Sequence, residues 1–128
     1  MANQVVHIEI IGPDPAILRT FYRELFDWDA PAGAPVAPAI SEVTEYSFIE
    51  PESDWGAAAG GIGGGTEFEA HTVFYIGVDD VRTTLARAVV LGGEVALAPQ
   101  INEGTGVMVG HFRDPAGNLI GVAAPGQT

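Results

Sequence analysis

The sequence predicts an α+β domain built from two tandem modules of the order β-α-β-β-β. Two observations carry this prediction. An apolar strand-like run followed by a capped, amphipathic helix occurs twice, and Asp80 of the second copy lies 66 residues after Asp14 of the first. Short strand-like segments separated by turn residues follow each of the two helices. We expect one domain over residues 1–128, with modules at about 4–65 and 70–125.

The first module opens with VVHIEII at residues 5–11, an apolar run that predicts a strand. Asp14 and Pro15 are typical of a helix N-cap and first helical residue. Apolar side chains at spacings of one and four continue the helix to near Asp27: Ile17, Leu18, Phe21, Tyr22, Leu25 and Phe26. A Pro/Ala-rich loop at 31–38, a strand within TEYSFIE at 44–50 and the small-residue run GAAAGGIGGG at 56–65 complete the module.

The second module repeats this order. TVFYIGV at 72–78 predicts a strand, Asp79 and Asp80 supply the helix cap, and Gly92 with Gly93 ends the helix. The apolar side of this helix carries Val81, Leu85, Ala88 and Val89. Three further strands are predicted within 93–99, 106–112 and 119–124, with the turn DPAGN between the last two.

Composition excludes several classes of function. Five basic against 17 acidic residues give a net charge of −12, which repels nucleic acid and anionic membrane surfaces. The chain has no cysteine, so disulfides and thiolate chemistry are excluded, and it has no lysine for a Schiff base. Because no apolar run approaches the roughly 20 residues of a membrane helix and no signal peptide pattern is present, we expect a cytoplasmic protein.

Five motifs in order resemble one known family. They are HIEI at 7–10, FYRELFDW at 21–28, VFYIGVDDV at 73–81, LGGEV at 91–95 and FRDPAGNLIGV at 112–122. Together they are similar to the vicinal oxygen chelate superfamily, which includes glyoxalases, bleomycin-resistance proteins and extradiol dioxygenases. The resemblance implies an open, cup-like half-barrel sheet with the helices outside, and a homodimer.

The resemblance also implies where a divalent ion would bind. In the metal enzymes of this family, the first and last strands of each module contribute one ligand each. His7 matches the first position, but Val73 stands at its repeat equivalent, Gly121 stands in the last strand, and the run AAAGGIGGG offers no donor side chain. Because an open catalytic site usually needs three protein ligands, we predict no metal cofactor. A displaced divalent-metal site formed by His7, Glu9 and His71 is the alternative.

The glycine positions suggest room for a ligand instead. Gly63 and Gly121 would leave open space where related enzymes project ligands, and the predicted ligand-binding residues are His7, Glu9, Phe48, Tyr75, Gly63 and Gly121. Equally, His7 could be a partly buried histidine bonded to the backbone, and Phe48 and Tyr75 could be core aromatics. His111 could face either side of the sheet.

Three functional hypotheses remain. The first is a glyoxalase-like or bleomycin-resistance-like protein that binds a small organic molecule, for which the acidic charge favours a cation. The second is an enzyme, either a metal-dependent lyase, isomerase or dioxygenase with a displaced site that includes His7, or an enzyme with His7 as general base. The third is a scaffold whose cup is filled by its own side chains. Whether the protein is an enzyme is left open, and we expect no nucleic acid or membrane partner.

Overall fold

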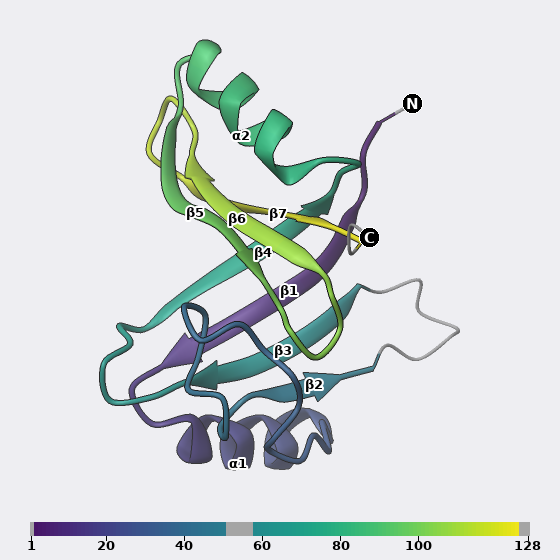
Figure 1. Ribbon diagram of the computed structural model, residues 1–128. Helices are drawn as coiled ribbons and strands as arrows, with labels where there is room; N and C mark the ends of the chain where they lie inside the picture. The colour runs from purple at the N-terminus through teal and green to yellow at the C-terminus, as the bar shows by residue number, and fades with distance from the viewer. Residues whose placement is uncertain (1, 51–57, 126–128) are drawn as a thin grey trace. The chain divides into compact units, whose positions relative to one another are not determined.

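The computed structural model describes residues 2–50 and 58–125, which belong to two compact units (Figure 1). Residues 7–72 form one unit, and residues 1–6 with 73–128 form the other. The first module contains β1 (Val5–Gly12), α1 (Pro15–Phe26), β2 (Ser47–Ile49) and β3 (Ala59–Gly64). The second contains β4 (His71–Gly77), α2 (Val81–Val90), β5 (Glu94–Ile101), β6 (Met108–Arg113) and β7 (Leu119–Ala124). The predicted α+β class is confirmed, and a strand and a helix followed by further strands occur in both modules.

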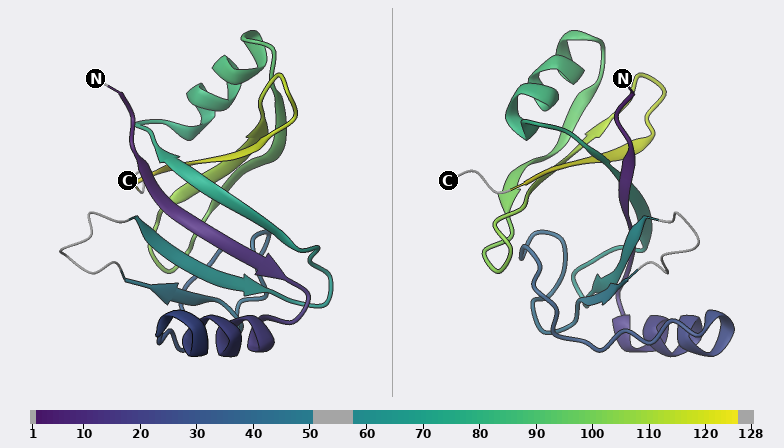
Figure 2. Two further views of the ribbon diagram at one scale, coloured as in Figure 1. Left: turned by 180° about the vertical axis from the view of Figure 1, so that it is seen from behind. Right: turned by 90° about the vertical axis from the view of Figure 1, so that its right-hand side faces the viewer.

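In the first module, β3 lies between β1 and β2, parallel to β1 and antiparallel to β2. The helix α1 begins as predicted, because the Asp14 carboxylate accepts a hydrogen bond from the Ile17 N–H at 3.3 Å. It ends at Asp27, which adopts the left-handed conformation (φ 61°) and donates its N–H to the Arg23 carbonyl. Figure 2 shows α1 from two further directions, and the helix contacts β3 in this unit.

The first module has one strand fewer than predicted. After α1 the described residues form only two strands, and the Pro/Ala-rich loop contributes an isolated bridge between Ala32 and Ser47. Pro31, Pro35 and Pro38 in this loop lack the N–H that a strand would need for pairing. The consequence is a long connection from α1 to β2 (Figure 2).

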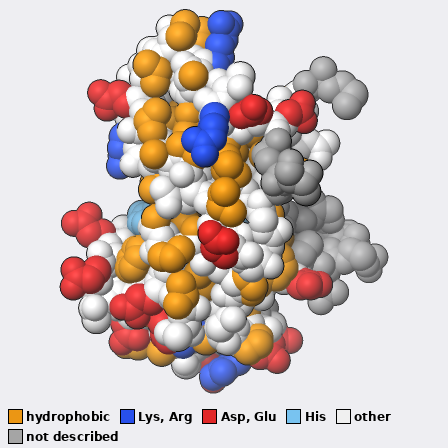
Figure 3. Space-filling model, viewed as in Figure 1, with side chains coloured by type: hydrophobic (Ala, Val, Ile, Leu, Met, Phe, Trp, Pro, Cys, Tyr) orange, Lys and Arg blue, Asp and Glu red, His pale blue; other side chains and the backbone are white. Residues whose placement is uncertain are grey.

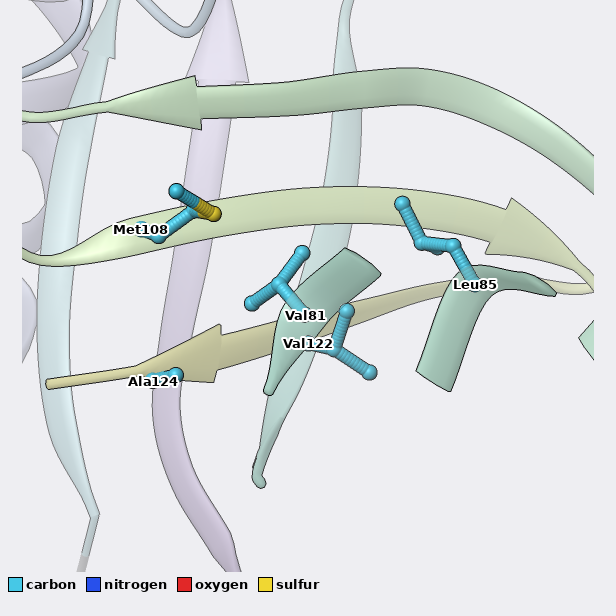
Figure 4. Packing of buried hydrophobic residues seen from close by; sticks show 5 residues of the cluster. All are labelled: Val81, Leu85, Met108, Val122 and Ala124. Carbon is cyan, nitrogen blue, oxygen red and sulfur yellow. The ribbon is translucent and has the colours of Figure 1, made fainter. Parts of the chain in front are cut away.

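The second module has the strand order β4-β7-β6-β5. Here β7 is parallel to β4, and β6 pairs antiparallel with both β7 and β5. The carboxylate of Asp80 caps α2 by accepting the Thr83 N–H at 3.1 Å, and Gly92 (φ 105°) follows the end of the helix. The helix packs on β5, β6 and β7, where the buried core consists of Val81, Leu85, Met108, Val122 and Ala124 (Figure 4).

The apolar stripe predicted for α1 is only partly buried. Leu18 contacts Gly12 of β1, whereas Ile17, Phe21 and Leu25 are each more than half exposed. The stripe extends beyond the side of the helix that contacts β3. None of the helices that the structure describes is long and apolar enough to cross a bilayer.

Candidate functional site

Three polar side chains of the first module form a hydrogen-bonded cluster. Strand alternation places His7 and Glu9 on the same face of β1, and Tyr46 immediately precedes β2. The Tyr46 hydroxyl donates to Glu9 Oε2 at 2.8 Å, and His7 Nε2 lies 2.8 Å from the Tyr46 oxygen and 3.5 Å from Glu9 Oε2. Since the phenol proton is directed to the carboxylate, His7 Nε2 must carry the hydrogen in its bond to Tyr46.

Burial governs the electrostatics of this cluster. Glu9 is 5% exposed and Tyr46 is 4% exposed, so the phenol supplies the hydrogen bond that a buried carboxylate needs. Burial raises the pKa of Tyr46 far above its ordinary value, and the charge of Glu9 and the hydrogen bond to it act in the same direction. Tyr46 therefore remains a neutral hydrogen-bond donor at physiological pH and does not act as an anionic base.

The glycines of β3 make room for Tyr46. Gly61 pairs with Glu9, and a Cβ at Gly61 would overlap the Tyr46 hydroxyl. A Cβ at Gly63 would lie 2.7 Å from Ser41 Oγ and 2.8 Å from Tyr46 Cδ1. The open space predicted at Gly63 is therefore wrong, because side chains of the same module occupy it.

The second module contains a comparable pair. The Tyr75 hydroxyl lies 2.7 Å from His111 Nε2, and the two residues are only 1% and 8% exposed. A Cβ at Gly121 would lie 2.5 Å from the Tyr75 ring, so the predicted open space at this glycine is also occupied. Glu9 pairs with Gly61, and Tyr75, which lies 66 residues after Glu9, pairs with Gly121. These registers confirm the 66-residue repeat and identify Gly61 as the counterpart of Gly121.

These positions do not fit the ion that the family resemblance implies. The four equivalent positions hold His7, Gly61, Val73 and Gly121, so one imidazole is the only donor side chain among them. The two glycines do not leave a cradle for another ligand, because tyrosine rings cover both. A divalent ion needs more nitrogen or carboxylate donors than this set provides.

The alternative set of His7, Glu9 and His71 is not assembled either. His71 Nδ1 lies 2.9 Å from the carbonyl oxygen of Glu69, two residues away in its own segment. In residues 2–50 and 58–125, no three histidine, aspartate or glutamate side chains form a group that could hold a metal ion. The part of the chain that the structure describes therefore does not assemble His7, Glu9 and His71 into one group.

A hollow of about 880 Å³ lies in the same module. Ile8 and Ile10 alternate with His7 and Glu9 along β1, so they line it from the opposite face of that strand. The described lining residues are mostly apolar or aromatic, with three carboxylates: Ile8, Ile10, Phe26, Asp27, Trp28, Asp29, Pro31, Phe48, Ile49, Glu50, Ala58, Gly60 and Gly61. Its volume is within the range of small-molecule sites.

Phe48 connects the hollow with the polar cluster. Its ring stacks on the imidazole of His7, with centroids 6.0 Å apart and planes at 15°, and Phe48 also lines the hollow. Of the predicted ligand-binding residues, the structure therefore brings together His7, Glu9 and Phe48. Tyr75 and Gly121 belong to the second module, where the Tyr75 ring covers Gly121 and the Tyr75 hydroxyl meets His111.

Sequence reasoning missed Tyr46, Phe26 and Trp28 as site residues. A usable signal for Tyr46 was present, because glycines at alternate positions of a buried strand, Gly61 and Gly63, indicate that a large side chain lies over them. Phe26 and Trp28 belong to the end of α1 and the following segment, and no pattern in the sequence indicates that a hollow begins there.

Comparisons with known proteins agree with this fold. A family model described as the Glyoxalase/Bleomycin resistance protein/Dioxygenase superfamily matches residues 4–122. No curated protein sequence matches the chain significantly.

Solved structures with the same fold are distant in sequence. A methylmalonyl-CoA epimerase variant from Streptomyces coelicolor, in complex with 2-nitronate-propionyl-CoA, matches with a TM-score of 0.68 and 19% identity, over 99% of this chain and 100% of that one. A hypothetical protein from Bacillus halodurans has a TM-score of 0.69 and 15% identity, with 100% and 98% covered. A glyoxalase/bleomycin resistance protein/dioxygenase superfamily member from Vibrio splendidus has a TM-score of 0.58 and 16% identity, with 96% and 99% covered. The chain belongs to the glyoxalase/bleomycin resistance protein/dioxygenase superfamily.

Proposed function

We propose that this protein binds a small organic molecule in the hollow of its first module, without the divalent ion of its metal-dependent relatives. The observation that carries the proposal is the hollow itself, about 880 Å³ in volume and lined mainly by apolar and aromatic side chains. Sites for small organic molecules typically combine such a lining with a few fixed polar groups. Here the carboxylates of Asp27, Asp29 and Glu50 are the charged groups of the lining.

The stacked rings of His7 and Phe48 support this proposal. The imidazole is held from one side by Tyr46, which is in turn held by the buried carboxylate of Glu9. Phe48 shares the face of His7, because it pairs with Gly61 and Gly61 pairs with Glu9, so a ligand that reaches Phe48 from the hollow would meet a residue already oriented before binding. Preorganisation of this kind lowers the entropy cost of association.

The charge of the chain argues against a coenzyme A ester as the ligand. The similar structures include methylmalonyl-CoA epimerases in complex with CoA derivatives. Coenzyme A carries several phosphate charges, and this chain offers five arginines and no lysine against 17 acidic residues. Long-range repulsion would oppose such a ligand, and it would favour a neutral or cationic one.

A second candidate function is an enzyme with His7 as general base. The chain from Glu9 through Tyr46 to His7 favours this candidate, because a buried carboxylate that orients an imidazole through a hydrogen bond is a common arrangement for proton transfer. The His7 side chain is 18% exposed, so a substrate could approach it. A compound that reaches the exposed part of this imidazole should then be converted by the wild type and remain unchanged with His7→Gln.

Protein-observed NMR of the labelled chain with a library of neutral, cationic and anionic aromatic fragments tests the proposal. Bound fragments should perturb the amide resonances of Ile8, Ile10 and Gly60, and Phe48→Ala should weaken their binding by about tenfold. Phe21→Ala is the matched control, because it removes an exposed phenyl ring that does not line the hollow. If no fragment binds, or if fragments bind without perturbing these resonances, the proposed function is wrong.

Metal analysis tests the second part of the proposal. We expect natively purified protein to contain less than about 0.1 equivalent of any transition or alkaline-earth ion, since a lone imidazole does not retain one. A stoichiometric ion that disappears with His7→Ala would overturn the metal-free proposal and favour an enzyme.

The homodimer that the family resemblance implies stays a prediction, which sedimentation equilibrium checks directly.

A further inference from the structure

We infer that the ligand of the first-module hollow is an organic cation with an apolar body. This inference rests on the proposed function, because it assumes that the ligand occupies the hollow. The lining contains three carboxylates, from Asp27, Asp29 and Glu50, and none of its described residues carries a positive charge. On the face shown in Figure 3, acidic side chains outnumber basic ones over the part where α1 and the loops of the first module lie. The field inside the hollow therefore favours a cation.

The end of α1 adds to this field. The helix ends at Phe26, and both Phe26 and the following Asp27 line the hollow. The last carbonyl groups of a helix carry a partial negative charge equivalent to about half an electron, which acts mainly within the last turn. The carbonyl groups and the three carboxylates therefore give the hollow a negative potential that the one basic side chain of the last turn, Arg23, offsets only in part.

Aromatic rings provide the complementary apolar contacts. Phe26 and Trp28 both line the hollow, with ring centroids 5.3 Å apart and planes at 46°. Tyr22 stacks on both of them, at 6.1 Å from Phe26 and 5.4 Å from Trp28, and so holds the two rings in place. The face of an aromatic ring attracts an ammonium group, and a tryptophan attracts it most strongly. Ile8 and Ile10 would contact the hydrocarbon part of the same ligand.

These features together discriminate between ligands of equal size. A neutral molecule would gain the apolar contacts alone, and an anion would be repelled by the carboxylates of the lining. A quaternary ammonium compound would gain the apolar contacts, the ring faces and the carboxylates. Because it has no N–H group to donate, its preference over a neutral isostere measures the electrostatic contribution directly.

Isothermal titration of the full chain with two isosteric probes tests the inference. The probes are phenyltrimethylammonium and its neutral analogue tert-butylbenzene, with 4-tert-butylbenzoate as the anion. We expect the cation to bind about tenfold more tightly than tert-butylbenzene and the anion not to bind. Raising the salt from about 10 mM to about 1 M shortens the Debye length from about 30 Å to about 3 Å, and should reduce the preference several-fold.

Neutralising two carboxylates of the lining provides the second part of the test. Asp27→Asn combined with Asp29→Asn should weaken phenyltrimethylammonium about fivefold and leave tert-butylbenzene unchanged. Asparagine keeps the left-handed conformation that residue 27 requires. Glu24→Gln is the matched control, because it removes one exposed charge of α1 that does not line the hollow.

The outcomes separate the inference from the proposed function. If tert-butylbenzene binds as tightly as the cation, or if neutralising Asp27 and Asp29 changes neither affinity, the inference is wrong and the proposed binding function stands. If neither probe binds and the fragment library also gives no ligand, the proposed function itself is wrong.

Discussion

Replacing Gly61 by alanine tests the packing of the polar cluster most directly. A Cβ at this position would overlap the Tyr46 hydroxyl and lie within 3.0 Å of Tyr46 Cε1, so the phenol would have to move. Overpacking of a buried site costs about 1–3 kcal/mol. Movement of the phenol would also break its hydrogen bond to the buried carboxylate of Glu9, which costs about 1.5–3 kcal/mol for a charged partner.

The two contributions predict a loss of about 2.5–6 kcal/mol in the free energy of unfolding. That is a large fraction of the roughly 5–15 kcal/mol that stabilises a typical domain. The measurement is urea denaturation followed by circular dichroism, with the midpoint and the slope fitted separately, because an unchanged slope shows that the denatured state is unaffected.

The neighbouring glycine provides the matched control. A Cβ at Gly60 would lie 3.5 Å from Ile8 and 3.6 Å from Ile49, which are ordinary contacts. Gly60→Ala should therefore change the free energy of unfolding by less than about 1 kcal/mol. If Gly61→Ala is as mild as Gly60→Ala, the described packing of Tyr46 is refuted. In a Tyr46→Ala background, Gly61→Ala should also cost less than about 1 kcal/mol, since the overlapping ring is gone.

Three further predictions concern stability. The pKa of Tyr46 in the folded state is raised above its unfolded value of about 10, so the stability that the neutral phenol contributes is fully present below pH 10 and is lost as the pH rises further. Above pH 10 the free energy of unfolding of the wild type, measured by urea denaturation, should therefore fall by about 1.4 kcal/mol more per pH unit than that of Tyr46→Phe. Gly121→Ala should cost about 2–4 kcal/mol because it displaces Tyr75, and a loss below about 1 kcal/mol would contradict that contact. Leu85→Ala should cost about 2–5 kcal/mol in the core beneath α2, whereas exposed Val90→Ala should change the thermal midpoint little.

The helices and the repeat could be predicted because their determinants are local. The Asp14 carboxylate caps α1, the Asp80 carboxylate caps α2, and Gly92 takes the positive φ that ends the second helix. The repeat offset could be found because strand and helix lengths are similar in the two modules up to the end of each helix. The smaller number of strands after α1 could not be found in this way, since strand formation depends on a pairing partner as well as on local sequence.

The site could be predicted only in part for the same reason. Alternation along β1 placed His7 and Glu9 on one face, and the structure confirms that they lie together. Their common partner Tyr46 is 37 residues away from Glu9 along the chain, at the end of a loop whose path depends on tertiary contacts. Phe48 was included among the site residues, yet its stacking on His7 depends on the register of β2 with β3.

The glycines of β3 and β7 lack a side chain that could bind a metal ion, yet they leave no empty space beside the strand. In the first module Gly61 admits a phenol that serves a buried carboxylate, and in the second Gly121 admits the ring of Tyr75, whose hydroxyl meets His111. The same backbone position is therefore used twice to bring a tyrosine close to a strand. A single substitution of Gly61 by histidine would not restore a metal ligand, because the new side chain and Tyr46 would compete for one volume. The glycine and the tyrosine of each module thus depend on each other, and a metal ligand could return only where the tyrosine is removed as well.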